Sequence, residues 1–244
     1  MRPIPKEVGT VECTISRNKS GFNFLYPKYI LKLSEGEKFL LQGKKRGANK
    51  TSNYMVSLEQ SSNKKDKGFL GKVRSNFMGT EFVIYDNGDN PKKKKKKMVG
   101  YYRKEMAALL YESNVLGSKG PRKMTVMIPT IDQDDNQYVW QPERPEDGMI
   151  SRFKANNHDN MLKFRNKEPK WNDTVQAYVL NFNGRVDQAS VKNFQLIMSD
   201  ENFIFMQFGK TGKNNFNMDV QWPLSLFQAL AISLTSIDKK YGCE

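Results

Sequence analysis

Basic residues in two short segments have the types and the spacing that phosphate binding requires. In GKKR, Lys44 and Arg46 stand two residues apart, and in GKVR, Lys72 and Arg74 have the same separation. Side chains two residues apart on a β-strand project from the same face, so each pair would act together. A lysine offers phosphate a point charge, and an arginine offers paired hydrogen bonds. The two pairs indicate a phosphate-binding site, and the alternative interpretation is a basic face that contacts only solvent.

Apolar neighbours set the direction of the first pair. If residues 38–46 run as a strand with Leu41 toward the core, Lys44 and Arg46 lie on the outer face. Phe39 would then lie on the core side together with Leu41. Lys45 would point the other way if the strand reaches it. The first segment is therefore expected to present two of its three basic side chains outward.

A second strand would bring Arg74 to the same site. Phe69 and Val73 are apolar and favour the core side of this strand. Lys72 and Arg74 alternate with them and therefore point outward. In a meander, Arg74 lies two strands from Arg46, and at about 4.8 Å per strand their backbones are roughly 10 Å apart. Long cationic side chains can converge on one phosphate cluster across that distance.

Motifs for catalysis, nucleotides or metals are weak in this sequence. The stretch GKKRGANKT is similar to a glycine-rich phosphate loop, but Asn49 precedes the lysine where glycine is needed, and Thr51 leads into a strand-like run. His158 is the one histidine, and without a nearby cysteine cluster it is expected to be a loop residue and not a metal ligand. No serine lies in a G-x-S-x-G elbow. We expect a binding protein without catalytic activity, cofactor or metal.

The composition narrows the classes of partner. The 244 residues include 40 Lys and Arg against 26 Asp and Glu, a formal net charge of +14. Such an excess favours nucleic acid, an acidic membrane leaflet or phosphorylated small molecules. Cys13 and Cys243 lie near opposite ends, so neither a disulfide framework nor a zinc site is expected. No apolar stretch opens the sequence, which favours an intracellular, soluble protein, and we expect one domain over residues 1–244.

Short strands dominate the expected secondary structure. Alternating or β-branched runs recur between turn residues, and Asn183-Gly184 between two of them is a hairpin signal. This pattern is typical of an all-β sandwich or barrel. The expected strands are residues 11–16, 29–33, 38–41, 53–58, 69–74, 81–85, 124–128, 138–140, 161–165, 176–182, 185–190, 194–198, 202–208 and 216–220.

One helix near the end of the chain is expected to be buried. Residues 222–241 read WPLSLFQALAISLTSIDKKY, and the apolar residues from Leu224 to Ile237 surround a helix on all sides. A helix that is apolar all round is buried, and its polar interruptions make this one too short to span a membrane. Ser225 and Gln228 predict a capping box at its start. A closed sheet wrapped around this helix satisfies both features, so we predict a mainly β barrel with a central helix.

Two further predictions concern the middle of the chain. Tyr102 to Tyr111 reads YRKEMAALLY and places its larger apolar residues on one side of a helix, which predicts a surface helix packed on the barrel. Lys92 to Lys97 is an unbroken run of six lysines just before it. Like charges at that density repel one another, so this run is expected to be a disordered basic loop.

Longer stretches of the sequence resemble one known family. The chain resembles the tubby-like carboxy-terminal domain over nearly all of its length. That resemblance implies a closed antiparallel barrel of twelve strands threaded by the hydrophobic carboxy-terminal helix. The stretches that carry it are KTSNYMVSL (50–58), GKVRSNFMGTEFVIYDNGDNP (71–91), YESNVLGSKGPRKM (111–124), WNDTVQAYVLNFNGRVDQASVKNFQLI (171–197), FMQFGK (205–210) and the terminal GCE.

The resemblance also implies a ligand and a location. Tubby-like domains bind phosphoinositides, chiefly phosphatidylinositol 4,5-bisphosphate, through basic residues of the GKKR and GKVRSN regions. Lys44, Arg46 and Arg74 occupy the matching positions, and Lys72 and Lys50 complete the expected headgroup-binding set. The implied function is recruitment to an anionic membrane at the cytoplasmic face of the plasma membrane, as a membrane-tethered adaptor whose protein cargo is not identified. The nucleus and the cilium are further locations that the family implies.

Two alternatives to membrane recruitment stay open. A DNA-binding transcription regulator would use the same basic groove, as has also been proposed for the family. A membrane-independent protein scaffold would bind its partners whether the pocket is filled or empty. Tubby-like proteins usually carry an amino-terminal segment with nuclear-targeting or ciliary-transport sequences. These residues contain no counterpart of that segment, so an adaptor role in intraflagellar transport is not carried over.

Overall fold

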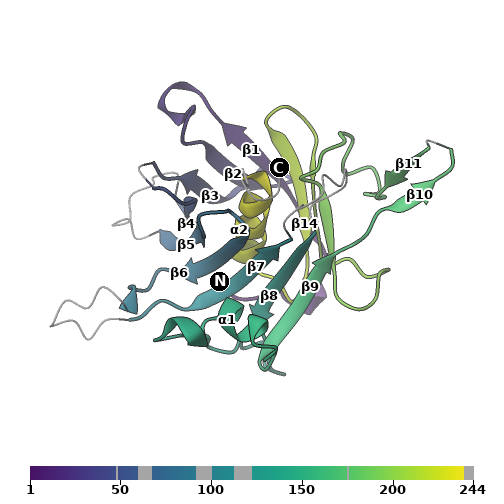
Figure 1. Cartoon of the computed structure of the whole chain (residues 1–244). Coiled ribbons are helices and arrows are strands. Elements are labelled where there is room, and N and C mark those ends of the chain that lie inside the picture. Colours follow the sequence, from purple (N-terminus) through teal and green to yellow (C-terminus); the bar gives the residue numbers. More distant parts are fainter. Residues whose placement is uncertain (48, 60–67, 92–100, 113–122, 175, 239–244) are drawn as a thin grey trace.

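In the computed structural model, twelve strands of the described residues close into one antiparallel barrel (Figure 1). The structure describes residues 1–47, 49–59, 68–91, 101–112, 123–174 and 176–238. Strands β1 to β9 pair consecutively, β12 pairs with β9, and β14 closes the barrel on β1. The barrel strands are β1 (Val11–Asn18), β2 (Lys28–Leu33), β3 (Phe39–Lys45), β4 (Asn53–Ser57), β5 (Phe69–Ser75), β6 (Glu81–Asp86), β7 (Glu105–Tyr111), β8 (Met124–Pro129), β9 (Met161–Asn166), β12 (Phe194–Ile197), β13 (Met206–Lys210) and β14 (Asn215–Val220).

The remaining described elements are one hairpin and five helical segments, which are not part of the barrel wall. A two-stranded hairpin, β10 (Lys170–Asn172) with β11 (Ala177–Val179), projects to the right in Figure 1. The helical segments are α1 (Met149–Lys154), α2 (Leu226–Ile237) and the 3-10 turns η1 (Lys6–Val8), η2 (Gly21–Asn23) and η4 (Pro145–Asp147).

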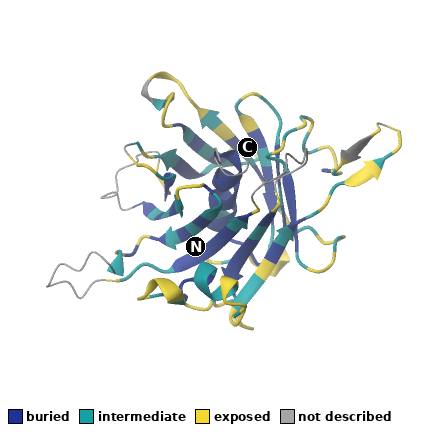
Figure 2. Cartoon of the chain, in the orientation of Figure 1, coloured by how far each residue is buried: buried dark blue, intermediate teal, exposed yellow. Residues whose placement is uncertain are grey.

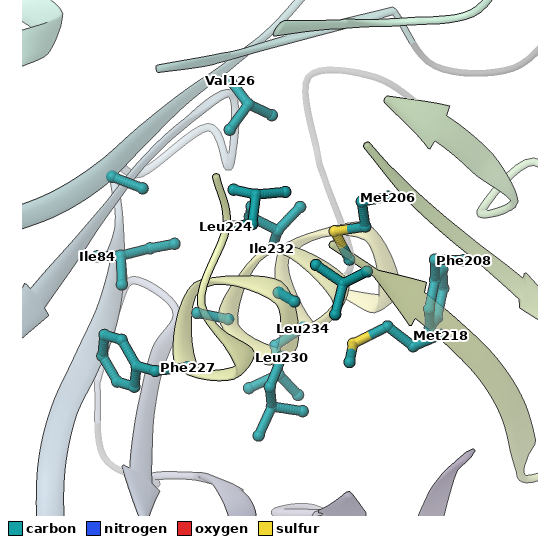
Figure 3. Close-up of a cluster of buried hydrophobic side chains, with 14 of the residues drawn as sticks. Ile84, Val126, Met206, Phe208, Met218, Leu224, Phe227, Leu230, Ile232 and Leu234 are labelled. Atoms are coloured by element: carbon teal, nitrogen blue, oxygen red, sulfur yellow. The ribbon is translucent and has the colours of Figure 1, made fainter. Parts of the chain in front are cut away.

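The predicted buried helix is confirmed as α2, which fills the barrel (Figures 1 and 3). All of its residues except Leu226 are buried, because wall residues such as Phe208 and Met218 pack around it. The capping box is also present: the Gln228 backbone N–H donates to Ser225 Oγ (3.2 Å), and the Ser225 N–H donates to Gln228 Oε1 (2.9 Å). The barrel and its helix therefore form one hydrophobic core.

Two glycines in the wall show how closely α2 approaches the strands. A Cβ atom on Gly43 of β3 would lie 2.7 Å from Leu234 Cδ1, and one on Gly71 of β5 would lie 2.8 Å from Phe227 Cζ. Both positions therefore face inward and have no room for a side chain. Because side chains alternate along a strand, the residues next to these glycines face the outer surface.

The helix predicted for Tyr102 to Tyr111 is wrong, because residues 105–111 form strand β7. This strand is buried on both faces: Ala107 and Leu109 face the main core, and Ala108 packs under Trp140 and Met149 on the outer side. A strand covered on both faces reads as a continuous apolar run and loses the alternation that marks a half-exposed strand. Over seven residues that run cannot be told from a helix by its periodicity.

Two other expected strands do not form part of the barrel. Residues 138–140 do not form a strand, and the Glu105 N–H at the start of β7 donates to the Trp140 carbonyl (2.8 Å). Of residues 176–182, only Ala177–Val179 is a strand, and it pairs with β10 outside the barrel. The first prediction is therefore wrong and the second is right only for residues 177–179, and neither segment joins the barrel wall.

The expected strand 185–190 is also wrong, and a salt bridge explains its path. Asn183 and Gly184 adopt positive φ angles of 50° and 76°, and the Arg185 N–H closes the turn on the Phe182 carbonyl (3.0 Å). The turn is therefore real, but no strands pair on either side of it. Instead Arg185 Nη2 lies 2.6 Å from Asp219 Oδ1 on β14, which fixes this segment across the outer wall.

Several predictions fall on residues outside the described structure. These include the disordered loop expected for Lys92 to Lys97 and the position of Cys243. Cys13 is described, and it is fully buried on β1. Burial raises the pKa of its thiol to about 12, so this side chain is an uncharged core residue.

Candidate anion-binding site

A row of three lysines crosses the outer wall of the barrel from β2 to β5. Lys28 of β2 pairs with Lys44 of β3. Lys44 in turn pairs with Met55 of β4, and Met55 pairs with Lys72 of β5. The outward direction predicted for Lys44 and Lys72 is therefore consistent with the strand register. Lys28 was not among the predicted residues, because only the β2–β3 register places it beside Lys44.

A second row lies nearer the end of the barrel and contains both arginines. The Arg46 N–H, one residue beyond β3, donates to the Asn53 carbonyl (2.8 Å). Asn53 pairs with Arg74 across β4 and β5, so it lies between the two arginines. Arg74 Nη2 donates to Thr51 Oγ1 (3.1 Å), which directs the guanidinium toward the β3–β4 connection.

Together the two rows place four predicted cations, Lys44, Arg46, Lys72 and Arg74, at the corners of a rectangle that we call the cationic quartet. Strand geometry sets its sides at about 10 Å across two strands and about 7 Å along each strand. Arg46 is exposed and the other three are half-buried. Such spacing allows their side chains to converge on one multiply charged anion.

A buried amide lies within the second row of the quartet. Asn53 is only 7% exposed, and its Oδ1 accepts no hydrogen bond from any residue that the structure describes. Leaving a buried acceptor unsatisfied costs about 1–3 kcal/mol. A hydroxyl group of a bound ligand could donate to this oxygen. Sequence reasoning missed Asn53, because its place between Arg46 and Arg74 depends on the pairing of three strands.

Lys45 occupies a different environment from its neighbours, as the alternation predicts. Its Nζ lies 2.7 Å from Asp238 Oδ1 at the end of α2 inside the barrel. The same carboxylate accepts hydrogen bonds from Tyr54 Oη (2.6 Å) and from the Ser52 hydroxyl. Burial raises the pKa of Tyr54, and the charge of Asp238 raises it further. Asp238 therefore anchors residues at both ends of the β3–β4 connection.

Lys50 is not brought into either row. It is exposed in the connection between β3 and β4, at a position where alternation along a strand does not apply. Asn49 next to it donates from Nδ2 to the Gly47 carbonyl (2.7 Å), as in a local turn. Lys50 therefore lies in the loop next to the quartet, outside the strand register that aligns the two rows.

An acidic residue bounds the first row beyond Lys72. Lys72 pairs with Tyr85 of β6, and Tyr85 pairs with Glu105 of β7. Burial raises the pKa of Tyr85 to about 12, and Glu105 adds to the shift, whereas Arg103 opposes it from 3.8 Å above the ring. Tyr85 is therefore a neutral hydroxyl group at the edge of the basic surface.

The described residues give no sign of a metal site or a membrane-spanning helix. The described residues contain no group of three or more His, Cys, Asp or Glu side chains that could hold a metal ion. His158 stacks on Phe153 with ring centroids 4.8 Å apart. Among the described helices, none combines the length and the apolar character needed to cross a bilayer.

Comparison with known proteins gives consistent matches along the whole chain. The model of the Tub family matches residues 1–239. Tubby-related protein 3 of Mus musculus is 43% identical over 249 residues, which cover 99% of this chain and 54% of that protein. Protein king tubby 1 of Aedes aegypti is 44% identical, and the match covers 100% of this chain and 59% of that protein.

A further relative is Tubby-related protein 1 of Homo sapiens, which is 41% identical over 248 residues that cover 100% of this chain and 46% of that protein. The chain therefore spans about half the length of the curated relatives it matches. None of these three names denotes an enzyme.

Proposed function

This chain belongs to the Tub family, and from that membership together with the cationic quartet we propose that it binds the headgroup of phosphatidylinositol 4,5-bisphosphate. In this proposal the chain is a membrane-recruitment module and not an enzyme. The observation that carries it is the arrangement of Lys44, Arg46, Lys72 and Arg74 in two aligned rows on one outer face.

The chemistry of the quartet fits two neighbouring phosphates. The 4- and 5-phosphates of the inositol ring are dianionic groups at a fixed separation. Lys44 can bridge them as a point charge, and Arg46 and Arg74 can each hold one phosphate by paired hydrogen bonds. Selectivity follows from this geometry, because moving one phosphate around the ring leaves a cation without its partner.

Asn53 supports a ligand that also carries hydroxyl groups. Its buried Oδ1 is an unsatisfied acceptor on the residue that lies between Arg46 and Arg74 across the sheet, and both of those side chains can only donate. An inositol hydroxyl would satisfy this oxygen, whereas inorganic phosphate at neutral pH offers mainly acceptors. The pair of observations favours a phosphorylated sugar-like ring over a simple anion.

The place of action in this proposal is the cytoplasmic face of the plasma membrane. Phosphoinositides present their phosphates to the cytosol, and a net charge of +14 adds a non-specific attraction to anionic lipid. Tethering there would allow the chain to carry a protein cargo, in the cilium or elsewhere. Release from the lipid would free it for the cytosol or the nucleus.

The test is titration calorimetry of the purified chain with soluble inositol phosphate headgroups that differ only in phosphate position. We expect the 4,5-bisphosphorylated headgroup to bind more tightly than the isomers with separated phosphates. Equal affinity for all isomers would contradict a built headgroup pocket.

The net charge also favours the second candidate, a DNA-binding groove, and the same sample can discriminate the two. DNA binding to a basic groove involves many phosphate contacts, so its affinity falls steeply with salt. We expect duplex DNA to bind weakly at physiological salt and not to compete with the headgroup. Tight DNA binding that displaces the headgroup would favour the transcription-regulator alternative.

A further inference from the structure

Three connections of the barrel meet at the end where α2 finishes. Because neighbouring strands are antiparallel, every second connection lies at the same end, so the β1–β2, β3–β4 and β5–β6 connections lie together. The Lys45 N–H donates to the Pro27 carbonyl (3.1 Å), which joins the first two. Ser75 and Ser52 exchange hydrogen bonds of 3.1 and 2.9 Å, which join the second and third. We call these three connections the rim.

Large apolar side chains are exposed on the rim. Phe24 and Leu25 in the β1–β2 connection are 70% and 69% exposed, and Figure 2 shows that connection as an exposed loop at the upper left. Phe77 and Met78 in the β5–β6 turn are 68% and 47% exposed. We call these four residues the apolar tips. They lie on both sides of the β3–β4 connection that leads from Arg46, so they flank the quartet.

The charge of the rim is of one sign. Residues 18–28, 44–52 and 75–80 contain no Asp or Glu, whereas they contain several lysines and Arg46. The opposite end of the barrel contains charges of both signs: its β4–β5 and β6–β7 connections contain lysines, including Lys92 to Lys97, and its β2–β3, β8–β9 and β12–β13 connections carry many acidic residues. Among these are Glu35, Glu37, Asp132, Asp134, Asp135, Asp200 and Glu201.

The rim combines exposed apolar side chains with lysines and contains no carboxylates. This combination is complementary to an anionic leaflet, in which acyl chains can accept the apolar groups and headgroups can accept the lysines. A protein partner would need a continuous surface or groove, whereas these tips project from separate connections. From this combination we propose that the rim inserts its apolar tips into the bilayer and thereby brings the quartet, on the adjoining wall, to the level of the phosphorylated headgroups. This inference rests on the proposed function and adds to it a second, apolar contact with the same membrane.

The experiment compares a tip variant with a control from the opposite end. The tip variant is Phe24→Ser with Phe77→Ser, and the control is Val139→Ser with Phe203→Ser, whose side chains are 55% and 47% exposed in the β8–β9 and β12–β13 connections at the opposite end. Each protein is measured on phosphatidylcholine vesicles that contain phosphatidylserine and phosphatidylinositol 4,5-bisphosphate. Each is also titrated with the soluble inositol phosphate headgroup.

We expect the tip variant to lose about tenfold or more in vesicle affinity, because two buried phenyl groups are removed from the lipid. Its affinity for the soluble headgroup should equal that of the wild type, and the control should keep both affinities. Wild-type vesicle binding by the tip variant would overturn the inference. If the wild type binds no soluble headgroup, the proposed function fails. In that case tip-dependent binding to the vesicles would still support insertion, and tip-independent binding would overturn it.

A second measurement reports insertion directly. In the Phe77→Trp variant, vesicles with bromine on the upper acyl chain should quench the new tryptophan beyond the quenching seen in the wild type. Quenching no greater than in the wild type would overturn insertion at this tip, whatever the affinities.

Discussion

At the scale of single residues, alternation along β3 gives adjacent basic side chains different functions. Arg46 lies on the outer row, whereas Lys45 points inward and binds Asp238 at 2.7 Å. The buried carboxylate needs this partner, because its other hydrogen bonds come from neutral hydroxyl groups. Charge-assisted contacts therefore serve ligand binding on one side of the strand and stability on the other.

Two single variants separate these functions. Arg46→Ala should weaken headgroup binding roughly ten- to hundredfold, because one charge-assisted hydrogen-bonded contact is lost, and should leave the melting temperature unchanged. Lys45→Ala should destabilise the fold by about 1–3 kcal/mol and change the affinity less, since it leaves Asp238 without its cation. Calorimetric titration and thermal unfolding measure both quantities. Equal losses of affinity in the two variants would contradict the alternation argument.

The site was only partly predictable from the residues. The direction of Lys44 and Arg74 follows from the period of two in a strand, which a short sequence window contains. The positions of Lys28 and Asn53 depend on register between strands, which apolar patterns alone do not fix. The partner of Lys45 is 193 residues away along the chain. No local pattern connects the two, so the sequence could show only that Lys45 points away from the site.

At the scale of elements, β7 is the strand that the periodicity of the sequence wrongly predicted to be a helix. Its outer face is covered by α1 and by Trp140, so Ala108 is as buried as Leu109. The covering elements follow about 30 to 50 residues later in the sequence, and they remove the alternation that would have identified the strand. The surface helix was predicted because the large apolar residues of this segment would lie on one side of a helix. A strand that is covered on both faces can give the same sequence pattern.

The contact between β7 and α1 should make stability depend on pH. Glu105 is buried and accepts the Met149 N–H (2.8 Å), and burial raises its pKa. With a raised folded pKa, the ionised carboxyl opposes folding, so its cost is absent in acid and appears as pH rises through the folded pKa. Glu105→Gln keeps the acceptor but cannot ionise. It should therefore be more stable than the wild type at neutral pH.

Urea unfolding of both proteins between pH 4 and pH 8 measures this difference. The advantage of Glu105→Gln should shrink as pH falls. An advantage that grows in acid would show that the carboxylate is stabilised by its surroundings, Arg103 included.

Among the elements, the central helix α2 should make the largest contribution to the free energy of unfolding. Leu230 has no exposed surface and lies within the barrel (Figure 3). Leu230→Ala removes buried methyl groups and leaves a cavity, so it should cost about 2–5 kcal/mol. Val139→Ala, at an exposed position, should cost less than about 0.5 kcal/mol. Chemical unfolding checks both values, and a small cost at Leu230 would mean that α2 packs loosely.

At the scale of the whole molecule, the barrel and its helix were predictable because they leave a strong pattern. Frequent turns between short strands indicate a β protein, and one helix that is apolar all round requires a sheet that surrounds it. The path of residues 176–193 was not predictable. Arg185 fixes that segment across the wall through Asp219, a residue that is distant in sequence. Charge also differs at this scale, because the three rim connections contain no Asp or Glu, whereas the connections at the opposite end contain charges of both signs.

The proposal that the cationic quartet holds the headgroup can be tested by one titration of two charge-matched double variants. The double variant Arg46→Ala with Arg74→Ala is compared with Lys163→Ala and Lys170→Ala, which removes the same net charge from exposed positions outside the quartet. Each protein is titrated with the soluble headgroup of phosphatidylinositol 4,5-bisphosphate at fixed salt. We expect the first double variant to lose more than about a hundredfold in affinity and the second to keep nearly unchanged affinity. Equal affinities in the two double variants would contradict the proposal.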